Sequence, residues 1–422
     1  MILMYMLRWS LTIGFALLLL AGAGPAGAGD TPASDWPGLW GPHRDARVAG
    51  PLRAEPGMQL VEAWRRPLGK GYSEVAATAG RGYTMYSDGE VDHLLAFEVA
   101  SGKEVWRARM AATYRGHGSD DGPISTPVIA DGRVFALDPW GVLFAFDAAA
   151  GRELWRRDLK ADLGAVPPFW GFATSPLPLG KTLVVQAGGA ERNNLVALDP
   201  ATGKTLWASQ PAKENGYSSP VSLTLAGTPQ VVAATNDKIF GVKPEDGTVL
   251  WTLPGIGEPR QSPMPLPGDR LLVMSPDIAA LLQVTHKDGV WQAVEVWKKP
   301  VFKGTYSPVV FHQGHLFGMN GMYLACVDPV TAEVKWREKI YSASLILVGD
   351  YLAVVGERSG SFQLVAATPE GFREALRIPV FTPGARTLTG PMFVDGGFLL
   401  RNGEEMVMLR LAPAARQAGA KP

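Results

Sequence analysis

Short segments of alternating apolar and polar residues, separated by turn residues, follow one another along most of the chain. In residues 142–155, an alternating apolar strand ends at Asp147, Gly151 supplies the positive φ that a turn needs, and a second strand carries Trp155. This pattern predicts a β-hairpin. A small residue six positions before a glycine, and a tryptophan four positions after it, recur in four segments: Ala96…Gly102…Trp106, Ala145…Gly151…Trp155, Ala197…Gly203…Trp207 and Gly241…Gly247…Trp251.

The tryptophans mark a longer repeat. They are separated by 49, 52, 44, 46 and 39 residues, at Trp106, Trp155, Trp207, Trp251, Trp297 and Trp336. A seventh unit, residues 362–376, has Ala375 at the tryptophan position. A hydroxyl–proline pair opens the first strand of most units, as in Thr126-Pro127, Ser175-Pro176, Ser219-Pro220, Ser262-Pro263 and Ser307-Pro308, and Glu74-Val75 takes this place in the first unit. A repeat of this length built only of strands predicts a β-propeller.

The two ends of the repeat region complete one unit. The last unit supplies only three strands, over residues 391–394, 398–401 and 406–411. The strand of residues 59–66, which carries Trp64, has no unit before it. We expect it to become the fourth strand of the last unit and close the ring, which leaves no open sheet edge. The prediction is an all-β, eight-bladed propeller over residues 59–412.

The segments outside the repeats predict export. In residues 1–28, Arg8 precedes an apolar stretch from Leu11 to Ala21 and a small-residue cleavage site at residues 26–28, as in a signal peptide. We expect its cleavage, no membrane span afterwards, and a periplasmic or secreted protein; a retained anchor is the alternative. Residues 29–58, with five prolines, predict an extended arm, and residues 413–422 a disordered tail.

Composition and motifs exclude several classes of function. The 40 basic and 40 acidic residues balance, whereas a nucleic-acid binder needs a basic excess. The six histidines show no metal-ligand spacing, and no nucleophile elbow or phosphate loop occurs. We predict no catalytic residues, no metal site and no nucleic-acid partner. The single Cys326 cannot form an internal disulfide, and it takes the small-residue position of its repeat, where we expect it to be buried.

Candidate binding residues lie in the loops before the innermost strands. These loops share one face of the ring, here called the mouth face. The six candidates are Glu74, Asp121, Trp170, Asn215, Arg260 and Arg386, accompanied by Tyr72, Tyr217, Tyr306 and Tyr341. This mixture suits a polar, anionic or carbohydrate-like ligand, unless it is merely the polar lining that any propeller mouth has. A buried Glu74 is expected to pair with Arg386 or Arg260, or to have a raised pKa.

The Ala-x-Asp-x-x-x-Gly-x-x-x-Trp hairpins resemble the tryptophan-docking repeats of pyrroloquinoline quinone (PQQ) dehydrogenases and of the BamB outer-membrane assembly family. Both families are eight-bladed, and their indoles lie between neighbouring blades. The segment from Trp36 to Asp45 resembles the start of exported PQQ-like repeat proteins, where Arg44 and Asp45 are expected to form an ion pair that ties the arm to the propeller.

The resemblance implies one function and one alternative. We expect a monomeric, non-catalytic propeller that binds a protein or another cell-envelope ligand at the mouth face, with no cofactor. It departs from BamB because no lipobox cysteine is present. The alternative is a PQQ-dependent alcohol or sugar dehydrogenase with PQQ and calcium in the central funnel. That family also needs two adjacent disulfide-bonded cysteines, which a chain with a single cysteine lacks.

Overall fold

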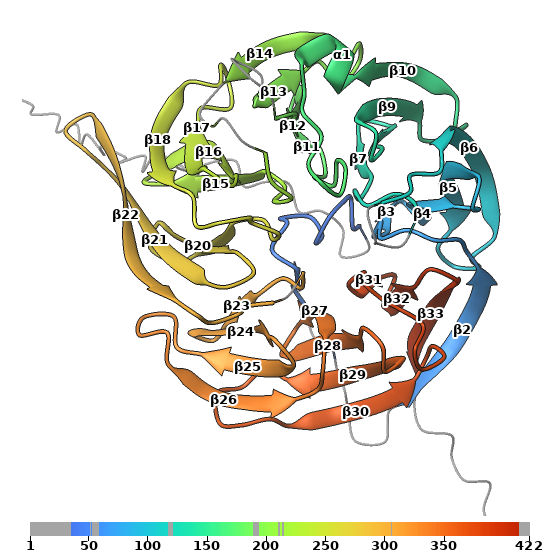
Figure 1. Ribbon diagram of the computed structural model, residues 1–422. Helices are drawn as coiled ribbons and strands as arrows, with labels where there is room; N and C mark the ends of the chain where they lie inside the picture. The colour runs from blue at the N-terminus through green and yellow to red at the C-terminus, as the bar shows by residue number, and fades with distance from the viewer. Residues whose placement is uncertain are drawn as a thin grey trace, which may run out of the picture. The chain divides into compact units, whose positions relative to one another are not determined.

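The strands follow the predicted alternation, because one set of side chains in each strand packs between sheets. The computed structural model describes residues 35–50, 52, 59–116, 121–188, 194–209, 212, 215–304 and 306–412. Within these residues the strands form eight sheets, seven of four strands and one of five. The sheets surround a central axis as the blades of a propeller (Figure 1). The predicted all-β, eight-bladed architecture is confirmed.

Blades 1 to 7 are meanders in which successive strands run from the centre to the perimeter. Blade 1 consists of β3 (Ala76–Thr78), β4 (Arg81–Ser87), β5 (Val91–Glu98) and β6 (Glu104–Ala112), and blade 2 of β7 (Val128–Ala130), β8 (Arg133–Leu137), β9 (Val142–Asp147) and β10 (Glu153–Asp158). Blade 3 consists of β11 (Leu177–Leu179), β12 (Thr182–Gln186), β13 (Leu195–Leu198) and β14 (Thr205–Ser209), and blade 4 of β15 (Val221–Leu225), β16 (Thr228–Ala234), β17 (Lys238–Val242) and β18 (Val249–Pro254). Blade 5 consists of β19 (Met264–Leu266), β20 (Arg270–Met274), β21 (Ala279–Lys287) and β22 (Val290–Lys299). Blade 6 consists of β23 (Val310–His312), β24 (His315–Asn320), β25 (Tyr323–Val327) and β26 (Val334–Lys339), and blade 7 of β27 (Ala343–Val348), β28 (Tyr351–Gly356), β29 (Ser361–Ala366) and β30 (Glu374–Pro379). A short helix, α1 (Leu159–Leu163), follows β10.

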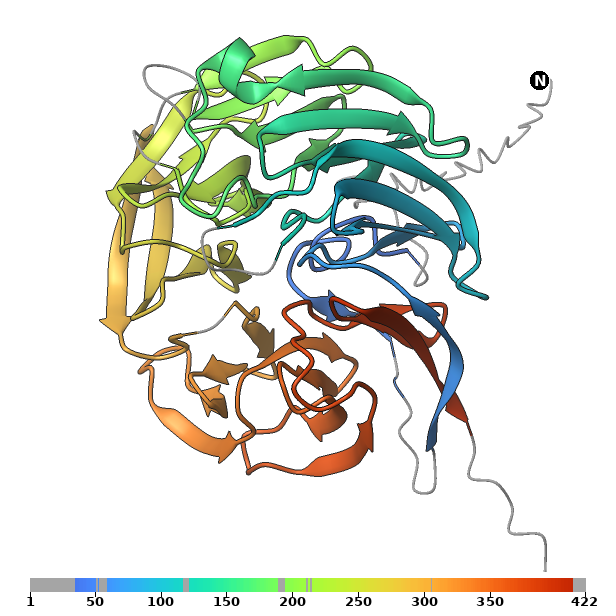
Figure 2. The same cartoon turned by 45° about the vertical axis from the view of Figure 1, so that its right-hand side comes forward.

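Blade 8 combines the two ends of the repeat region, as predicted. Its strands are β31 (Met392–Val394), β32 (Gly397–Arg401), β33 (Glu405–Ala412) and β2 (Gln59–Pro67). Strand β2 pairs antiparallel with β33, with Trp64 opposite Met408. The blue strand β2 lies beside the red strand β33 in Figures 1 and 2. The closure is therefore made by main-chain hydrogen bonds along a whole strand.

Six of the repeat indoles donate to a turn of the following blade. The Trp64 Nε1–H donates to Val99 O at 2.9 Å, and a Cβ added at Gly102 would lie 2.7 Å from the Trp64 ring. Gly102 also has a φ of 69°, so this position needs glycine for both space and conformation. Equivalent bonds link Trp106 to Ala148, Trp155 to Pro200, Trp207 to Pro244, Trp297 to Pro329 and Trp336 to Thr368.

Two blades depart from this arrangement for a local reason. The Trp251 Nε1–H donates to Gln230 Oε1 in its own blade at 2.7 Å, because the hairpin of blade 5 is extended and places no turn beside the indole. In blade 7, Leu376 and not Ala375 occupies the tryptophan position, since it pairs with Leu364 across a longer hairpin. The following blade joins β33 and β2 without a hairpin, so it offers no turn for an indole.

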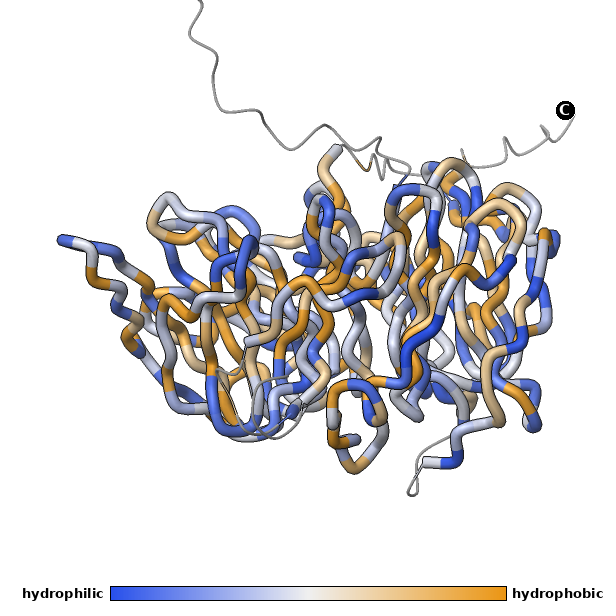
Figure 3. Tube along the Cα trace, turned by 90° about the horizontal axis from the view of Figure 1, so that it is seen from above, coloured by the Kyte–Doolittle hydropathy of each residue, from blue (hydrophilic) through white to orange (hydrophobic). Residues whose placement is uncertain are grey.

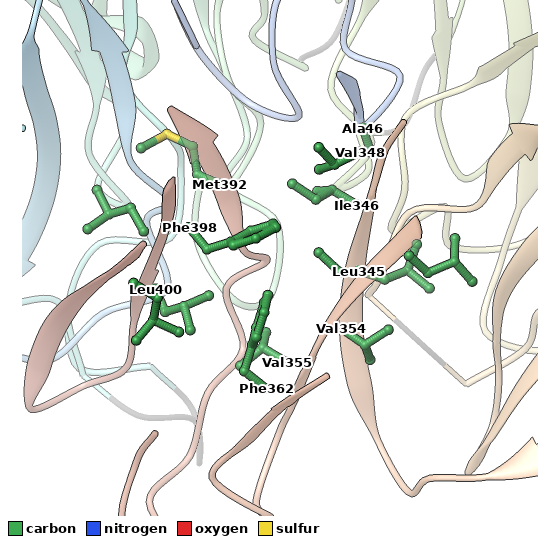
Figure 4. Packing of buried hydrophobic residues seen from close by; sticks show 14 of the residues in the cluster. Ala46, Leu345, Ile346, Val348, Val354, Val355, Phe362, Met392, Phe398 and Leu400 are labelled. Atoms are coloured by element: carbon green, nitrogen blue, oxygen red, sulfur yellow. The ribbon is translucent and has the colours of Figure 1, made fainter. Parts of the chain in front are cut away.

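The core lies between the blades. Apolar stretches run along the strands in Figure 3, and hydrophilic residues are frequent at the turns. Between blades 7 and 8, the rings of Phe362 and Phe398 have centroids 4.8 Å apart, and Ala46 of the arm lies beside Val348 (Figure 4). Cys326 is fully buried opposite Trp336, and burial raises the pKa of its thiol to about 12, which confirms the packing role.

The expected signal peptide (residues 1–28) and tail (residues 413–422) lie outside the described residues. No helix in the described ranges is long and apolar enough to cross a membrane. The arm is described at residues 35–50 and 52.

We predict that Trp64→Ala lowers the free energy of unfolding by about 3 kcal/mol, because it removes the packing that joins blade 8 to blade 1. Urea unfolding of the purified protein measures this change. The matched control is Val61→Ala on the same strand, where the side chain is 42% exposed and the expected change is within about 0.5 kcal/mol. Equal losses in the two variants would contradict the docking role of Trp64.

Candidate functional site

The arm runs through the centre of the ring. Trp36 pairs with Ala77 of blade 1, and β1 (Arg47–Val48) adds a parallel fifth strand to blade 7 beside β27. Between them, Trp40, Arg44 and Ala46 adopt left-handed φ angles of 57°, 54° and 55°. Figures 1 and 2 show this blue segment near the ring axis. Residues in this conformation cost free energy, so the surrounding contacts must hold the arm in place.

Arg44 is the main attachment of the arm. Its buried guanidinium donates to the carbonyl oxygens of Ser175, Pro176 and Pro220, which belong to the innermost segments of blades 3 and 4. Burial lowers its pKa to about 9. The expected ion pair with Asp45 is wrong: Asp45 Oδ1 accepts from the Arg47 main-chain N–H at 3.2 Å. The arm is tied to the propeller, but main-chain oxygens take the place of the carboxylate.

The hydroxyl–proline pairs link neighbouring blades around the axis. The Glu74 N–H donates to Thr126 Oγ1 at 3.2 Å, the Thr126 N–H to Ser175 Oγ at 3.0 Å, and the Ser175 N–H to Ser219 Oγ at 2.8 Å. Each hydroxyl thus accepts from the preceding blade, while the proline after it needs no hydrogen-bond partner for its nitrogen. These hydroxyls form a row of polar groups at the start of the innermost strands of blades 2 to 4.

A cavity of about 260 Å³ lies at this end of the axis. The arm contributes Leu39 and Trp40 to its wall, and the hydroxyls of Thr126, Ser175, Ser219 and Ser262 line it. Its other aromatic residues are Tyr72, Trp170, Tyr217 and Tyr306, and its charged residues are Glu74, Arg260 and Arg386. A concave, largely aromatic wall with a few converging polar groups is typical of a small-molecule site.

The structure brings four of the six predicted residues together at this cavity: Glu74, Trp170, Arg260 and Arg386. The other two lie outside its lining. Asp121 Oδ2 is 3.1 Å from Arg115 Nη1 and 3.7 Å from Lys70 Nζ, so its charge is used within the loops. The Asn215 amide donates to Ala187 O at 3.4 Å.

Glu74 lies deep in the protein, yet its side chain remains partly accessible because it faces the cavity. Its Oε1 accepts from the Gly390 N–H at 3.0 Å, and the Trp40 N–H also contributes a hydrogen bond. Burial raises the pKa of Glu74 to about 7, although these two hydrogen bonds favour the ionised form and lower the pKa. Of the two expected alternatives, pairing with Arg386 or Arg260 or a raised pKa, the structure shows the second.

The two cavity arginines have partners of their own. Arg260 Nε lies 3.0 Å from Glu258 Oε1, and its Nη1 donates to Tyr306 Oη at 3.0 Å. Arg386 Nε lies 3.2 Å from Glu357 Oε1, and its guanidinium stacks over the ring of Tyr72 with a centroid distance of 5.9 Å. Both guanidiniums are held in place before any ligand arrives.

The metal part of a quinone site does not fit this cavity. Among the described residues, no three His, Cys, Asp or Glu side chains are grouped so that they could hold a metal ion. Glu74 is the carboxylate of the cavity lining, and Cys326 is buried within blade 6. Calcium needs six to eight oxygen ligands, usually with several carboxylates, so this donor set is too small.

Sequence reasoning missed two features of the site. The arm residues Leu39 and Trp40 line the cavity, and no local pattern indicates that the arm enters the ring. Thr126, Ser175, Ser219 and Ser262 were recognised only as strand starts, although their place at the start of the innermost strands could have identified them as lining residues.

We predict that Glu74 makes the protein less stable as the pH rises from about 4.5 to about 7. The folded state holds this proton up to a higher pH than the unfolded state, so the stabilisation is present below the unfolded pKa and is lost towards the folded pKa. Burial likewise raises the pKa of Asp92 to about 7 and of Asp138 to about 6, so the wild-type slope includes three groups.

The test is urea unfolding at pH 5, 6 and 7. From pH 5 to pH 7, the free energy of unfolding should fall by about 2 kcal/mol less in Glu74→Gln than in the wild type. Glu333→Gln, on the exposed perimeter, is the control and should retain the wild-type slope. Parallel curves for Glu74→Gln and the wild type would show that the cavity carboxyl does not titrate in this range.

Comparisons with known proteins agree with this fold. A family model described as outer membrane protein assembly factor BamB matches residues 87–338. The curated BamB of Bordetella pertussis (strain Tohama I) is 24% identical over 200 residues, which cover 46% of this chain and 45% of that protein. The match thus spans somewhat less than half of the curated relative.

Solved structures extend the likeness to most of the chain. BamB from Moraxella catarrhalis aligns with a TM-score of 0.60 at 13% identity, covering 86% of this chain and 100% of that one. A quinohemoprotein alcohol dehydrogenase, ADHIIG from Pseudomonas putida HK5, aligns with a TM-score of 0.53 at 12% identity, covering 92% and 82%. At these identities the structures show a shared fold only. The family-model match covers more than half of the chain, which therefore belongs to the BamB-like family of PQQ-repeat β-propellers.

Proposed function

We propose that this chain is a non-catalytic propeller of the cell envelope that binds a partner protein on its mouth face. The observation that carries the proposal is a group of exposed large apolar side chains on loops of that face. They are Trp140, Val166, Phe169, Tyr306, Met322 and Tyr341. Aromatic residues and methionine are enriched at protein interfaces, where they bury a large area at a low entropic cost.

The loops explain why these side chains share one face. In a four-stranded meander, the connections before the first strand and after the second strand lie at the same end of the blade. Trp140 and Met322 occupy connections of the second kind, and Phe169, Tyr306 and Tyr341 occupy connections of the first kind. They therefore surround the cavity, and a partner could contact several blades at once.

Family and sequence support the location. A relative carries the description outer membrane protein assembly factor, and the first 28 residues have the pattern of a signal peptide. We therefore propose a periplasmic or secreted protein. A role in outer membrane protein assembly rests on the family likeness alone.

The competing function is a PQQ-dependent dehydrogenase, because a quinohemoprotein alcohol dehydrogenase shares the fold. The cavity offers aromatic walls and two arginines to a quinone, but it lacks the donor set for the calcium ion that accompanies the cofactor in that family. We therefore propose that the chain works without PQQ.

We predict that a photoreactive amino acid at position 169 captures an envelope protein in cells that produce the full chain. Phe169 is 63% exposed on the mouth face. Position 290, on the perimeter, is the control, because Val290 is 67% exposed on an outer strand. Mass spectrometry should identify an outer membrane protein or an assembly component from position 169 only. Capture from position 290 alone, or from neither position, contradicts the proposal.

We predict that the purified protein neither binds PQQ nor oxidises alcohols or sugars with it. PQQ and Ca²⁺ are added in stoichiometric amounts, and quinone absorbance and dye reduction are followed with alcohols and sugars. The expected result is an unchanged PQQ spectrum and no turnover. Stoichiometric PQQ binding with substrate-dependent dye reduction would establish the dehydrogenase function instead.

A further inference from the structure

We infer that the cavity binds a small zwitterion, an amine–carboxylate whose two charged groups stand at opposite ends of the molecule, with the ligand's ammonium at Glu74 and its carboxylate at Arg260. The inference concerns the interior of the cavity and does not depend on a protein partner at the loops around it. It rests on the positions, charges and hydrogen-bond partners of the lining residues.

The two charged groups stand on opposite walls. Glu74 precedes the innermost strand of blade 1, and Arg260 precedes that of blade 5. In a ring of eight blades, the first and the fifth lie across the axis from each other (Figure 1). One cavity of about 260 Å³ touches both residues, so a single molecule can reach both. The cavity therefore has a carboxyl group at one wall and a guanidinium group at the opposite wall.

The carboxyl wall lacks a cation. Among the described residues, Glu74 is bonded by the main-chain amides of Gly390 and Trp40, and no lysine or arginine side chain forms an ion pair with it. A carboxylate in a buried position is costly unless a positive charge accompanies it. A ligand ammonium would supply that charge, and the carboxyl is accessible from the cavity.

The guanidinium wall retains a free donor group. Arg260 uses Nε for Glu258 and Nη1 for Tyr306, and the described structure assigns no partner to its Nη2. Glu258 and Tyr306 fix the orientation of the guanidinium, so a ligand carboxylate would meet a positioned donor. Arg386 also pairs with a carboxylate, that of Glu357, but it precedes the innermost strand of blade 8, which is next to blade 1, so it does not stand opposite Glu74.

The remaining walls suit the body of such a molecule. Trp40, Trp170 and Tyr217 present aromatic surfaces, which favour both an ammonium group and the apolar segment between the two charged ends of the ligand. The main-chain N–H of Trp170 donates to Tyr217 Oη at 2.9 Å, so these two aromatic residues hold each other in place. The cavity is smaller than the roughly 300 Å³ at which pockets for drug-sized ligands begin, so the ligand must be small.

The first experiment uses calorimetry on the purified wild-type protein at pH 8, where the Glu74 carboxyl, with a pKa of about 7, is ionised. The probes are 4-aminobutanoate, 6-aminohexanoate and 8-aminooctanoate, whose charges are separated by chains of increasing length, followed by the amine and the carboxylate analogues of the tightest one; for 6-aminohexanoate these are hexylamine and hexanoate. We expect one zwitterion to bind, and each analogue to bind about 10- to 100-fold more weakly because it loses one charged hydrogen-bonding group.

The second experiment assigns the two walls. Glu74→Gln should weaken the binding of the zwitterion and of the amine analogue about 10- to 100-fold and leave that of the carboxylate analogue unchanged. Arg260→Gln should weaken the binding of the zwitterion and of the carboxylate analogue by the same factor and leave that of the amine analogue unchanged. Controls on the same face are Asp121→Asn and Arg115→Gln, which lie outside the cavity lining and should bind as the wild type does. Thermal unfolding verifies that each variant is folded.

Three results would overturn the inference. The first is that none of the zwitterions binds to the wild type at millimolar concentration. The second is that a zwitterion binds no more tightly than its amine or its carboxylate analogue. The third is that both cavity variants bind like the controls. The wild-type series decides between zwitterion and single-charge ligand even if Glu74→Gln does not fold.

Discussion

The contact between an indole and a turn of the next blade is the interaction on which the ring depends. A blade of four strands cannot bury both of its faces alone, so its stability comes from its neighbours. The indole of one blade lies against the glycine peptide of the next, as Trp64 does at Gly102, and donates to a turn carbonyl. Where the next blade offers no suitable turn, the indole bonds within its own blade or is replaced by Leu376.

Closure of the ring adds a second constraint, which the buried arginines meet. Arg401 of blade 8 donates to main-chain oxygens of Gly69, Gly71, Ser73 and Met85 and to Thr84 Oγ1, and it thereby joins the last blade to the first. Arg44 joins the arm to blades 3 and 4 in the same way, by donating to main-chain oxygens. Burial lowers the pKa of each to about 9, which reflects the cost of enclosing a charge without a carboxylate partner. Several carbonyl dipoles compensate for this cost.

These structural devices determine what the centre of the molecule can bind. Because the arm lies near the axis, Leu39 and Trp40 form part of the wall of the cavity at the mouth face. The Trp40 amide also bonds to Glu74, so the arm that blocks the axis helps to set the chemistry of the cavity carboxyl.

The sequence by itself determined the repeat, the number of blades, the composite eighth blade and the face on which the loops converge. These features depend on patterns that are local along the chain: alternation within strands, glycine in turns and tryptophan at a fixed offset. Only the tertiary structure decided which charges meet. Arg44 bonds to residues 131 to 176 positions away, and Glu74 to an amide 316 positions away. Four of the six predicted site residues share the cavity because their loops precede innermost strands. Asp121 and Asn215 do not, because neighbouring loops engage their side chains, and such contacts have no signature along the chain.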